Sequence, residues 1–225
     1  MNKKIVSGMM LTLLLIGMLS LVFNIQLVKA GGIGLYYSSY NNIYANYIAN
    51  NDVGISFHYS SNNKIYHNNF IDNSQQTSSL SSINIWDNGY PSGGNYWSDY
   101  TGVDLYNGPY QNETGSDGIG DTPYIIDANN QDNYPLMEPW SPPTMIKTLI
   151  RTVKFWNLSE GTENSLTSKL KGALHHLDME KENGAVHKLM IFINKVEASR
   201  LRKLTSNQAD YLTTEAQRII DLING

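Results

Sequence analysis

The chain has 225 residues, a formal net charge of −4 and no cysteine, which excludes disulfides, thiol catalysis and Cys-ligated metals. Between Gly31 and Trp140 the only basic residue is Lys64, and all but one of the 15 tyrosines lie before Ser141. So acidic a first part argues against nucleic acid as a partner and favours cations instead.

The amino-terminal segment has the features of an export signal. Lys3 and Lys4 precede the apolar stretch LTLLLIGMLSLVF, and Val28-Lys29-Ala30 offers a small-residue cleavage site before Gly31. The apolar run is also long enough for an uncleaved membrane anchor, which stays open as the alternative. In both cases residues 1–30 are expected outside the folded domain. The rest is expected to be secreted or at the cell surface, touching membrane only through this segment if it is uncleaved.

Two stretches repeat at an offset of 22 residues without a gap. GIGLYYSSYNNIYANYIANN (32–51) aligns with GISFHYSSNNKIYHNNFIDN (54–73). Short alternating runs of Ile, Tyr and Phe favour strands, and such a period is typical of one solenoid coil. A parallel β-helix is therefore predicted, with matching residues stacked on one another. The expected inward pairs are Ile33 and Ile55, Leu35 and Phe57, Ile43 and Ile65, and Ile48 and Phe70.

Asparagine is expected at the corners of these coils, because it tolerates the left-handed backbone of tight turns. Asn63 and Asn68 are the expected stacked corner residues of the second repeat. A third, degenerate coil is predicted around Ile83 to Trp86. So few repeats leave the first coil with an open edge, which suggests self-association with another chain.

The N-x-I-x-x-N-x-I/F-x-x-N pattern resembles the repeats of NosD-like right-handed parallel β-helix proteins, which are common among archaeal surface proteins. INIWDNGYPSGGNYWSDY and SDGIGDTPYIIDANNQDNYPLMEPW resemble the segment that closes such β-helices. The resemblance implies a short right-handed parallel β-helix, an all-β solenoid, with a carboxy-terminal cap over residues 31–140. It implies fold more firmly than activity, since members range from carbohydrate-binding or carbohydrate-cleaving proteins to adhesive surface proteins. The NosD name also carries an association with copper.

Acid-base cleavage of a sugar chain needs two carboxylates held across one bond. Residues 31–140 contain no Arg and no Asp-Asp pair. Asp87 and Asp99 are the candidate catalytic pair of a hydrolase or lyase, and the alternative is that these acids only form turns.

Metal binding is a further hypothesis. Asp117-Gly-Ile-Gly-Asp121, with Asp127 and Asp132 after it, alternates carboxylates with glycines, as calcium loops do, but lacks the EF-hand spacing. Asp117, Asp121 and Asp127 are the candidate ligands. A structural Ca²⁺ on these three aspartates and a metal-free turn remain the two interpretations. Copper would need converging His, Met or Cys, whereas His58 and His67 do not align in the repeat and are expected to be isolated surface residues.

Aromatic residues are dense in the first part of the chain. Sugars are commonly held on aromatic faces, with amide side chains bonding their hydroxyls. The candidate binding residues are Tyr37, Tyr44, Tyr59, Tyr66, Trp86 and Trp97. The competing interpretation assigns these rings, the tryptophans above all, to cross-strand stacks and cap packing.

After Pro143 the apolar pattern becomes helical. Four stripes predict a small α-helical bundle over residues 144–225, joined by a Pro-rich linker at 141–143, and Thr205-Ser-Asn-Gln208 is a capping box opening the fourth helix. NLSEGTENSLTSKLKGALHHL and FINKVEASRLRKLTSNQADYLTTEAQRIIDLI closely resemble the FIMAH-type domain of secreted proteins. The resemblance implies a surface accessory module rather than a reaction.

The primary hypothesis is an exported, non-catalytic surface protein that binds a glycan or another surface polymer through its β-helix. The alternatives are a polysaccharide hydrolase or lyase, and an accessory protein that handles Ca²⁺ or Cu²⁺.

Overall fold

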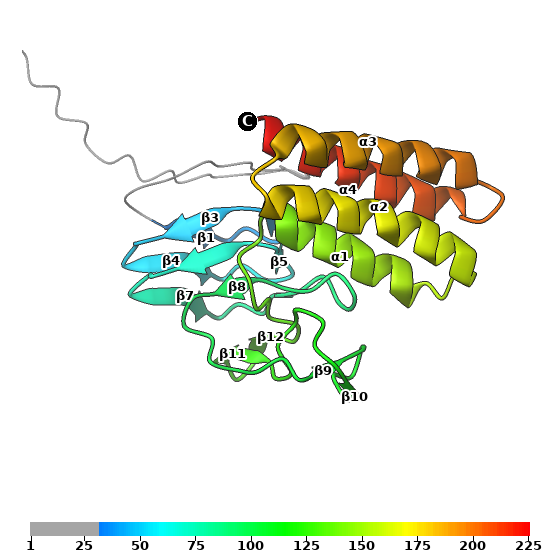
Figure 1. The fold of residues 1–225 in the computed structure, drawn as a ribbon. Coiled ribbons are helices and arrows are strands. Elements are labelled where there is room, and N and C mark those ends of the chain that lie inside the picture. The colour runs from blue at the N-terminus through cyan, green and yellow to red at the C-terminus, as the bar shows by residue number, and fades with distance from the viewer. Residues whose placement is uncertain (1–31) are drawn as a thin grey trace, which may run out of the picture. The chain divides into compact units, whose positions relative to one another are not determined.

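The computed structural model describes residues 32–225, which form two compact units that divide between Trp140 and Ser141 (Figure 1). The first unit contains short strands and the second contains helices, so the predicted two-domain layout is confirmed. The predicted export signal at residues 1–30 lies outside the described residues. No helix within residues 32–225 is both long and apolar enough to cross a bilayer.

Three parallel sheets make up the repeat region. The first contains β1 (Ile33–Tyr36), β4 (Val53–His58) and β7 (Gln75–Leu80); the second contains β2 (Asn42–Tyr44) and β5 (Lys64–Tyr66); the third contains β3 (Tyr47–Ala49), β6 (Asn69–Ile71) and β8 (Tyr96–Trp97). Each sheet takes one strand from each successive pass of the chain. The predicted 22-residue register is confirmed, since Ile33 pairs with Ile55, Ile43 with Ile65, and Ile48 with Phe70.

The inward residues predicted from the repeat form the core between these sheets. Ile55, Phe57, Ile65 and Phe70 are fully buried, and their partners in the first pass are buried or half-buried. Two tryptophans complete the cluster. Trp97 stacks on Phe70 with ring centroids 4.3 Å apart, and Trp86 meets Phe57 edge-on at 5.5 Å.

A third pass is present around the predicted segment, but its inward residues are Asn84 and Trp86 rather than its two isoleucines. β7 pairs with β4, Ile85 pairs with Lys64, and β8 pairs with β6. Ile83 and Ile85 are 57% and 55% exposed, whereas Asn84 and Trp86 are buried. In the third pass Trp86 therefore closes the apolar core, while the buried Asn84 contributes hydrogen bonds rather than aliphatic contacts.

The segment after the third pass contains two small antiparallel pairs. These are β9 (Tyr106–Asn107) with β10 (Glu113–Thr114), and β11 (Tyr124–Asp127) with β12 (Asn130–Asp132). Ile119 and Leu136 are buried and pair with each other through an isolated bridge. This cap segment brings several acidic side chains to the last pass of the parallel sheets.

The second unit is a bundle of four helices. They are α1 (Pro142–Phe155), α2 (Glu160–Asp178), α3 (Glu182–Ser199) and α4 (Ser206–Asn224). Consecutive helices pack against one another, and α4 also packs on α1, which closes the bundle (Figure 1). Pro142 and Pro143 lie in the first turn of α1. Backbone N–H groups in a first turn have no partner within the helix, so the N–H that proline lacks costs no hydrogen bond there. Pro142 and Pro143 of the segment predicted as a linker thus belong to the helix, and Ser141 is its N-cap.

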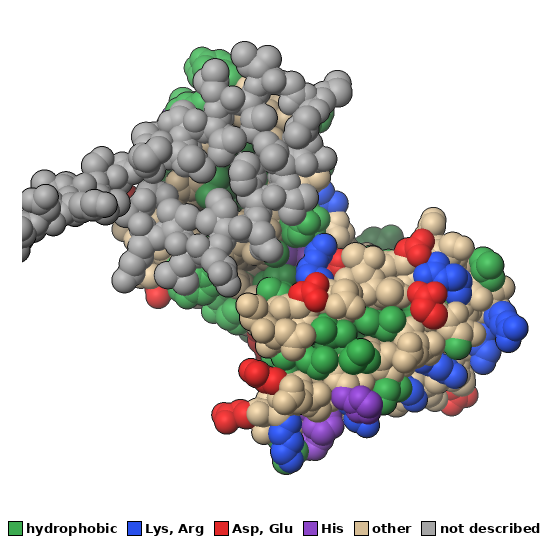
Figure 2. Space-filling model, turned by 90° about the horizontal axis from the view of Figure 1, so that it is seen from above, with side chains coloured by type: hydrophobic (Ala, Val, Ile, Leu, Met, Phe, Trp, Pro, Cys, Tyr) green, Lys and Arg blue, Asp and Glu red, His purple; other side chains and the backbone are tan. Residues whose placement is uncertain are grey.

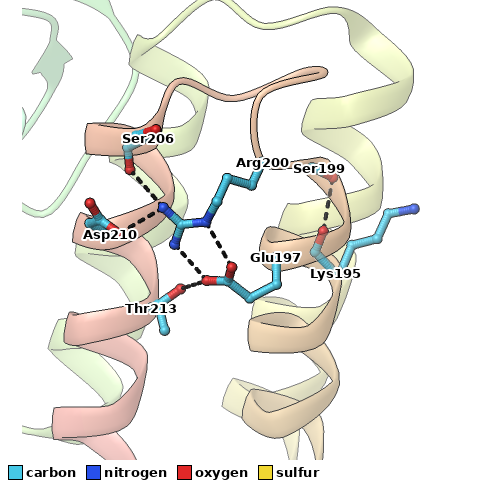
Figure 3. Close-up of polar contacts among 7 residues, drawn as sticks. All are labelled: Lys195, Glu197, Ser199, Arg200, Ser206, Asp210 and Thr213. Carbon is cyan, nitrogen blue, oxygen red and sulfur yellow. Dashed lines mark hydrogen bonds and ion pairs between the residues drawn. The ribbon is translucent and has the colours of Figure 1, made fainter.

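Charged side chains hold the turn between α3 and α4 (Figure 3). Arg200 donates two hydrogen bonds to Glu197 and one to Asp210, each 2.7 Å long. These bonds from Arg200, and a further one from Thr213, lower the pKa of Glu197 to about 2. Because the cluster lies at the surface, it orients the turn more than it stabilises the bundle.

The fourth helix begins with the predicted capping box. Thr205 Oγ1 accepts from the Gln208 backbone N–H at 3.2 Å, and Gln208 Oε1 accepts from the Thr205 N–H at 2.9 Å. Thr205→Ala is expected to lower the free energy of unfolding of the bundle by about 1 kcal/mol. Thr214→Ala, the same change at an exposed position inside the helix, should leave stability unchanged or slightly higher. Urea unfolding followed by far-UV circular dichroism measures both, and equal losses would contradict the capping role.

Candidate functional site

Each full pass of the repeat turns at four corners, and each corner holds a residue with left-handed backbone, at φ between 49° and 63°. They are Tyr37, Tyr59 and Ser81, then Tyr40 and Asn62, then Ala45 and His67, and finally Asn50 and Asp72. The expectation that the stacked asparagines occupy these positions is wrong. Each stacked asparagine follows its corner residue by one position and turns inward, where it can complete several hydrogen bonds.

The inward asparagines form ladders along the stack, and Asn46, Asn68 and Asn95 make one of them. Asn68 Oδ1 accepts from the backbone N–H and the Nδ2 of Asn46, at 3.1 and 2.8 Å. Asn95 Oδ1 accepts the same two bonds from Asn68, at 3.1 and 2.9 Å. The Nδ2 of Asn68 also donates to the carbonyls of Ile43 and Tyr66. All three amides are buried, so these bonds replace those that water would make.

The other corners follow the same rule. With the ladder of Asn46, Asn68 and Asn95 counted as the first, the second contains Asn41, Asn63 and Asn84, the third contains Asn51 and Asn73, and the fourth contains Ser38, Ser60 and Ser82. In every rung, the side-chain oxygen accepts from the backbone N–H of the matching residue one pass earlier. The donors of every ladder therefore point toward the cap, and the last rung needs an acceptor there.

Asp132 supplies that acceptor for the first ladder. Its Oδ2 accepts from the Asn95 N–H at 2.7 Å and from Trp97 Nε1 at 2.9 Å, and its Oδ1 accepts from the Tyr134 N–H at 3.0 Å. Burial raises the pKa of Asp132 to about 7, against the opposing effect of these donors. Gly94 allows the approach, since a Cβ there would lie 1.9 Å from Asp132 Oδ1. The sequence did not predict this role for Asp132, because the residue lies outside the repeat and at no fixed offset from it.

Asn130 ends the second ladder. Its Oδ1 accepts from the Asn84 N–H at 2.9 Å and from Trp86 Nε1 at 3.1 Å. Its Nδ2 donates to the two carboxylate oxygens of Asp127, at 3.0 and 2.8 Å. Asp127, a predicted calcium ligand, thus orients the amide that ends this ladder.

Asp99 ends the third ladder through one intermediate. Asn73 Nδ2 donates to Gln76 Oε1 at 2.9 Å, and Gln76 Nε2 donates to Asp99 Oδ1 at 3.0 Å. The Tyr124 hydroxyl donates to both oxygens of Asp99, at 3.2 and 3.1 Å. Burial first, and then the nearby Asp99, raise the pKa of Tyr124 above its ordinary value. Acidic side chains of the cap segment therefore accept hydrogen bonds from the last residues of the ladders.

Tyrosine rings lie outside this framework, at matching positions of successive passes. Tyr37 and Tyr59 stack with ring centroids 5.2 Å apart and 7° between their planes, yet they remain 78% and 53% exposed. Tyr36 stacks on His58 at 4.7 Å, one residue earlier on each strand. We call the Tyr37–Tyr59 pair with these two neighbours the tyrosine face.

Two family models match the chain. Residues 20–102 match the family described as periplasmic copper-binding protein (NosD), and residues 143–221 match the FIMAH domain. The chain joins a NosD-like region to a FIMAH domain. The first match spans the strands of the three parallel sheets, and the second spans α1 to most of α4. Both resemblances inferred from the sequence motifs are confirmed. A search of curated proteins found no match.

The other aromatic candidates of the NosD-like region divide into two groups. Tyr44 and Tyr66 stack at 5.2 Å but are only partly exposed. Trp86 and Trp97 are 0% and 1% exposed, so the prediction that they bind a ligand at the surface is wrong. They pack in the core as the competing interpretation held, because their indole N–H groups find buried acceptors in the cap.

Asp87 and Asp99, the candidate catalytic pair, share no hydrogen-bond partner among residues 32–225. Asp87 Oδ1 accepts from the Gly89 N–H at 2.9 Å, and its Oδ2 accepts from the N–H and Nδ2 of Asn133, at 3.2 and 2.8 Å. Asp99 is bonded to the third ladder and Tyr124, as described above. Both oxygens of each carboxylate thus hold local structure, which matches the turn-forming alternative.

The predicted calcium ligands likewise act in turns. Asp121 accepts from two backbone N–H groups of the facing loop, at 2.9 and 3.1 Å, and Asp117 Oδ1 accepts from the Ile119 N–H at 3.0 Å. Asp127 holds Asn130. Within the described chain, no group of three or more His, Asp or Glu side chains is placed to hold a metal ion. The Ca²⁺ hypothesis therefore has no cluster of ligands to support it.

The two histidines of the NosD-like region are engaged with aromatic rings. His67 is buried and stacks on Trp140 with centroids 3.6 Å apart, and its Nε2 lies 3.1 Å from the Ser92 carbonyl. The expectation that His67 is a surface residue is wrong. His58 is half-exposed and stacks on Tyr36, so the two imidazoles belong to different environments.

Proposed function

We propose that this chain is an exported, non-catalytic surface or periplasmic protein that binds an extended neutral glycan on its tyrosine face. In this proposal the NosD-like region is a short right-handed parallel β-helix that spaces the rings. The periplasmic description of the NosD family and the signal-like amino-terminal segment support export. The observation that carries the proposal is the Tyr37–Tyr59 pair, because a contiguous aromatic surface left in water often marks an interaction site.

The geometry of the tyrosine face suits a chain of sugar rings. Rings stacked once per pass present a continuous apolar strip along one direction, against which successive sugar rings can pack. The exposed Tyr40, Ser39 and Asn62 lie at neighbouring corner positions and can bond sugar hydroxyls. Lys64 is the only base of residues 31–140, so the region offers little that would attract a polyanion. These features together favour a neutral polysaccharide.

The helical unit is proposed to act as the accessory module of this protein. On the face of the bundle seen in Figure 2, acidic and basic side chains are interspersed around an apolar strip. Such a mixed surface favours attachment to another protein over attraction by charge alone.

The other candidate functions have less support. A hydrolase or lyase would need carboxylates free to act on a bond, and those of Asp87 and Asp99 are bonded internally. Copper, named in the description of the NosD family, would need converging imidazole or sulfur ligands. His58 and His67 do not converge, and residues 32–225 provide no cluster of three metal-binding side chains. The donors present do not fit copper, and we do not carry it over.

The binding proposal predicts that Tyr37→Ala/Tyr59→Ala loses affinity for its polysaccharide. Two exposed aromatic anchors at roughly 1–2 kcal/mol each correspond to a loss of about 30-fold to 1,000-fold. Pull-down against a panel of insoluble neutral polysaccharides, followed by titration of the best binder, measures the loss. Tyr110→Ala serves as the matched control, since Tyr110 is 83% exposed but lies in the cap. Wild-type protein that binds no polysaccharide above background would contradict the glycan proposal. Equal affinity of the double variant and the Tyr110→Ala control would show that the tyrosine face is not the binding surface.

A further inference from the structure

Two asparagines of this asparagine-rich chain are followed, two positions later, by a hydroxyl residue. They lie in Asn112-Glu-Thr114 and Asn157-Leu-Ser159, and the middle residue is not proline in either case. Both triplets are therefore acceptor motifs for N-linked glycosylation. Both asparagines are exposed, and neither belongs to a ladder or to the tyrosine face.

The parallel sheets account for the lack of such motifs among the ladder asparagines. In the first two ladders, the residue two positions after each asparagine packs in the core, where Ser or Thr would replace its apolar contacts. These core residues are Ile43, Ile48, Ile65, Phe70, Trp86 and Trp97. The two acceptor motifs lie outside the sheets of the repeat, one in the cap segment and the other between α1 and α2.

The Asn112 motif lies on an open hairpin. It follows the turn between β9 and β10, in which Gln111 has left-handed backbone at φ 46°. Thr114 is held through its backbone, which pairs with Tyr106 and accepts from Asn107 Nδ2 at 3.2 Å. Within residues 32–225, neither the Asn112 amide nor the Thr114 hydroxyl makes a hydrogen bond, and both residues are exposed. The two groups that define the motif are thus accessible together.

The Asn157 motif differs in its third residue. Ser159 is the N-cap of α2, and its hydroxyl oxygen lies 2.8 Å from Thr162 Oγ1. The Ser159 carbonyl also accepts from the Thr162 and Glu163 N–H groups, at 2.8 and 3.0 Å. An enzyme that reads this hydroxyl would have to open the first turn of α2, which costs free energy that the hairpin does not require.

We infer that Asn112 is the acceptor of an N-linked glycan in the folded protein, and that Asn157 is not. The donor is a lipid-linked oligosaccharide, and the transfer needs an oligosaccharyltransferase. Asn112 Nδ2 forms a C–N bond to the anomeric carbon of the first sugar. The C–O bond from that carbon to the lipid pyrophosphate breaks, the lipid pyrophosphate leaves, and the amide gives up one proton.

The inference rests on the export part of the proposed function, because such motifs are used in secreted proteins. It leaves the tyrosine face free, since β9 and β10 lie away from β1 and β4 in the first unit (Figure 1). Asn112→Gln should therefore keep the polysaccharide affinity of the wild type.

Transfer to the purified, folded full chain tests the inference. The reagents are an oligosaccharyltransferase that reads N-x-S/T and a lipid-linked oligosaccharide of known mass, and intact-mass spectrometry follows the product. Wild type and the matched control Asn157→Gln should each gain one glycan, whereas Asn112→Gln should gain none. Thr114→Val should lose the modification and Thr114→Ser should keep it. Synthetic peptides of residues 108–117 and 153–162 should both be modified, which assigns the selectivity to the fold.

In the folded chain, transfer to Asn112 should be at least about tenfold faster than transfer to Asn157. Folded wild type that stays unmodified at Asn112 while peptide 108–117 reacts would overturn the inference. So would rejection of that peptide, or equal rates at the two asparagines of the folded chain. The assay depends neither on export nor on polysaccharide binding, so a failure of the proposed function is distinguishable from a failure of this inference.

Discussion

Asn68→Ala is expected to lower the free energy of unfolding of the NosD-like region by about 4 kcal/mol. The substitution removes the acceptor of the Asn46 N–H and Nδ2, and the donor to the Ile43 and Tyr66 carbonyls. These groups are buried among close-packed side chains, where water cannot replace the lost bonds without a local opening. The loss should therefore exceed that of an ordinary surface substitution several-fold.

Urea unfolding followed by tryptophan fluorescence measures this loss, since Trp86, Trp97 and Trp140 all lie in the first unit. Asn42→Ala is the matched control, because Asn42 is an exposed residue of β2, and it should change stability by less than about 0.5 kcal/mol. A similar midpoint for the two variants would show that the ladder contributes no more than a surface amide.

Asp132→Asn is expected to remove a pH dependence of stability. The pKa of Asp132 is raised from 3.8 to about 7 in the folded protein, so the folded state holds this proton more tightly than the unfolded chain does. The stability that comes from this group is complete below about pH 4 and is lost as the pH rises to about 7. The full loss is on the order of 4 kcal/mol. The asparagine variant does not titrate and should lack this slope.

The measurement is the difference in unfolding free energy between wild type and Asp132→Asn across pH 4 to 8. Asp52→Asn removes an exposed acid and is the control for a general effect of charge. A difference in unfolding free energy that stays constant with pH would mean that the three donors described around Asp132 keep its pKa near the ordinary value.

The repeat carried most of the information that made the fold predictable. The two copies of the repeat identified the inward pairs of the first two passes without knowledge of any contact. A residue type that recurs at the same offset is expected to have the same structural role in both copies. The four helices and the capping box at Thr205 could be predicted equally well, because both patterns depend on residues close together in sequence.

The cap could not be predicted in the same way. Asp132 and Asn130 meet their partners across 37 and 46 residues, at distances in sequence that no period predicts. The tryptophans were ambiguous for a related reason. An indole ring suits a core or a sugar site equally well, and only the buried acceptors of the cap decide for the core. The corners were misassigned because the inward hydrogen bonds of asparagine outweigh its tolerance of left-handed backbone.

The repeated amides form the internal frame of the NosD-like region, and in our proposal binding falls to the tyrosine face. Hydrogen exchange at the asparagine side-chain amides tests this frame most directly. The Nδ2 protons of Asn46 and Asn68 should exchange at least about 100-fold more slowly than those of the exposed Asn42 and Asn62. Equal exchange of the two pairs would place the amides in water and contradict the account.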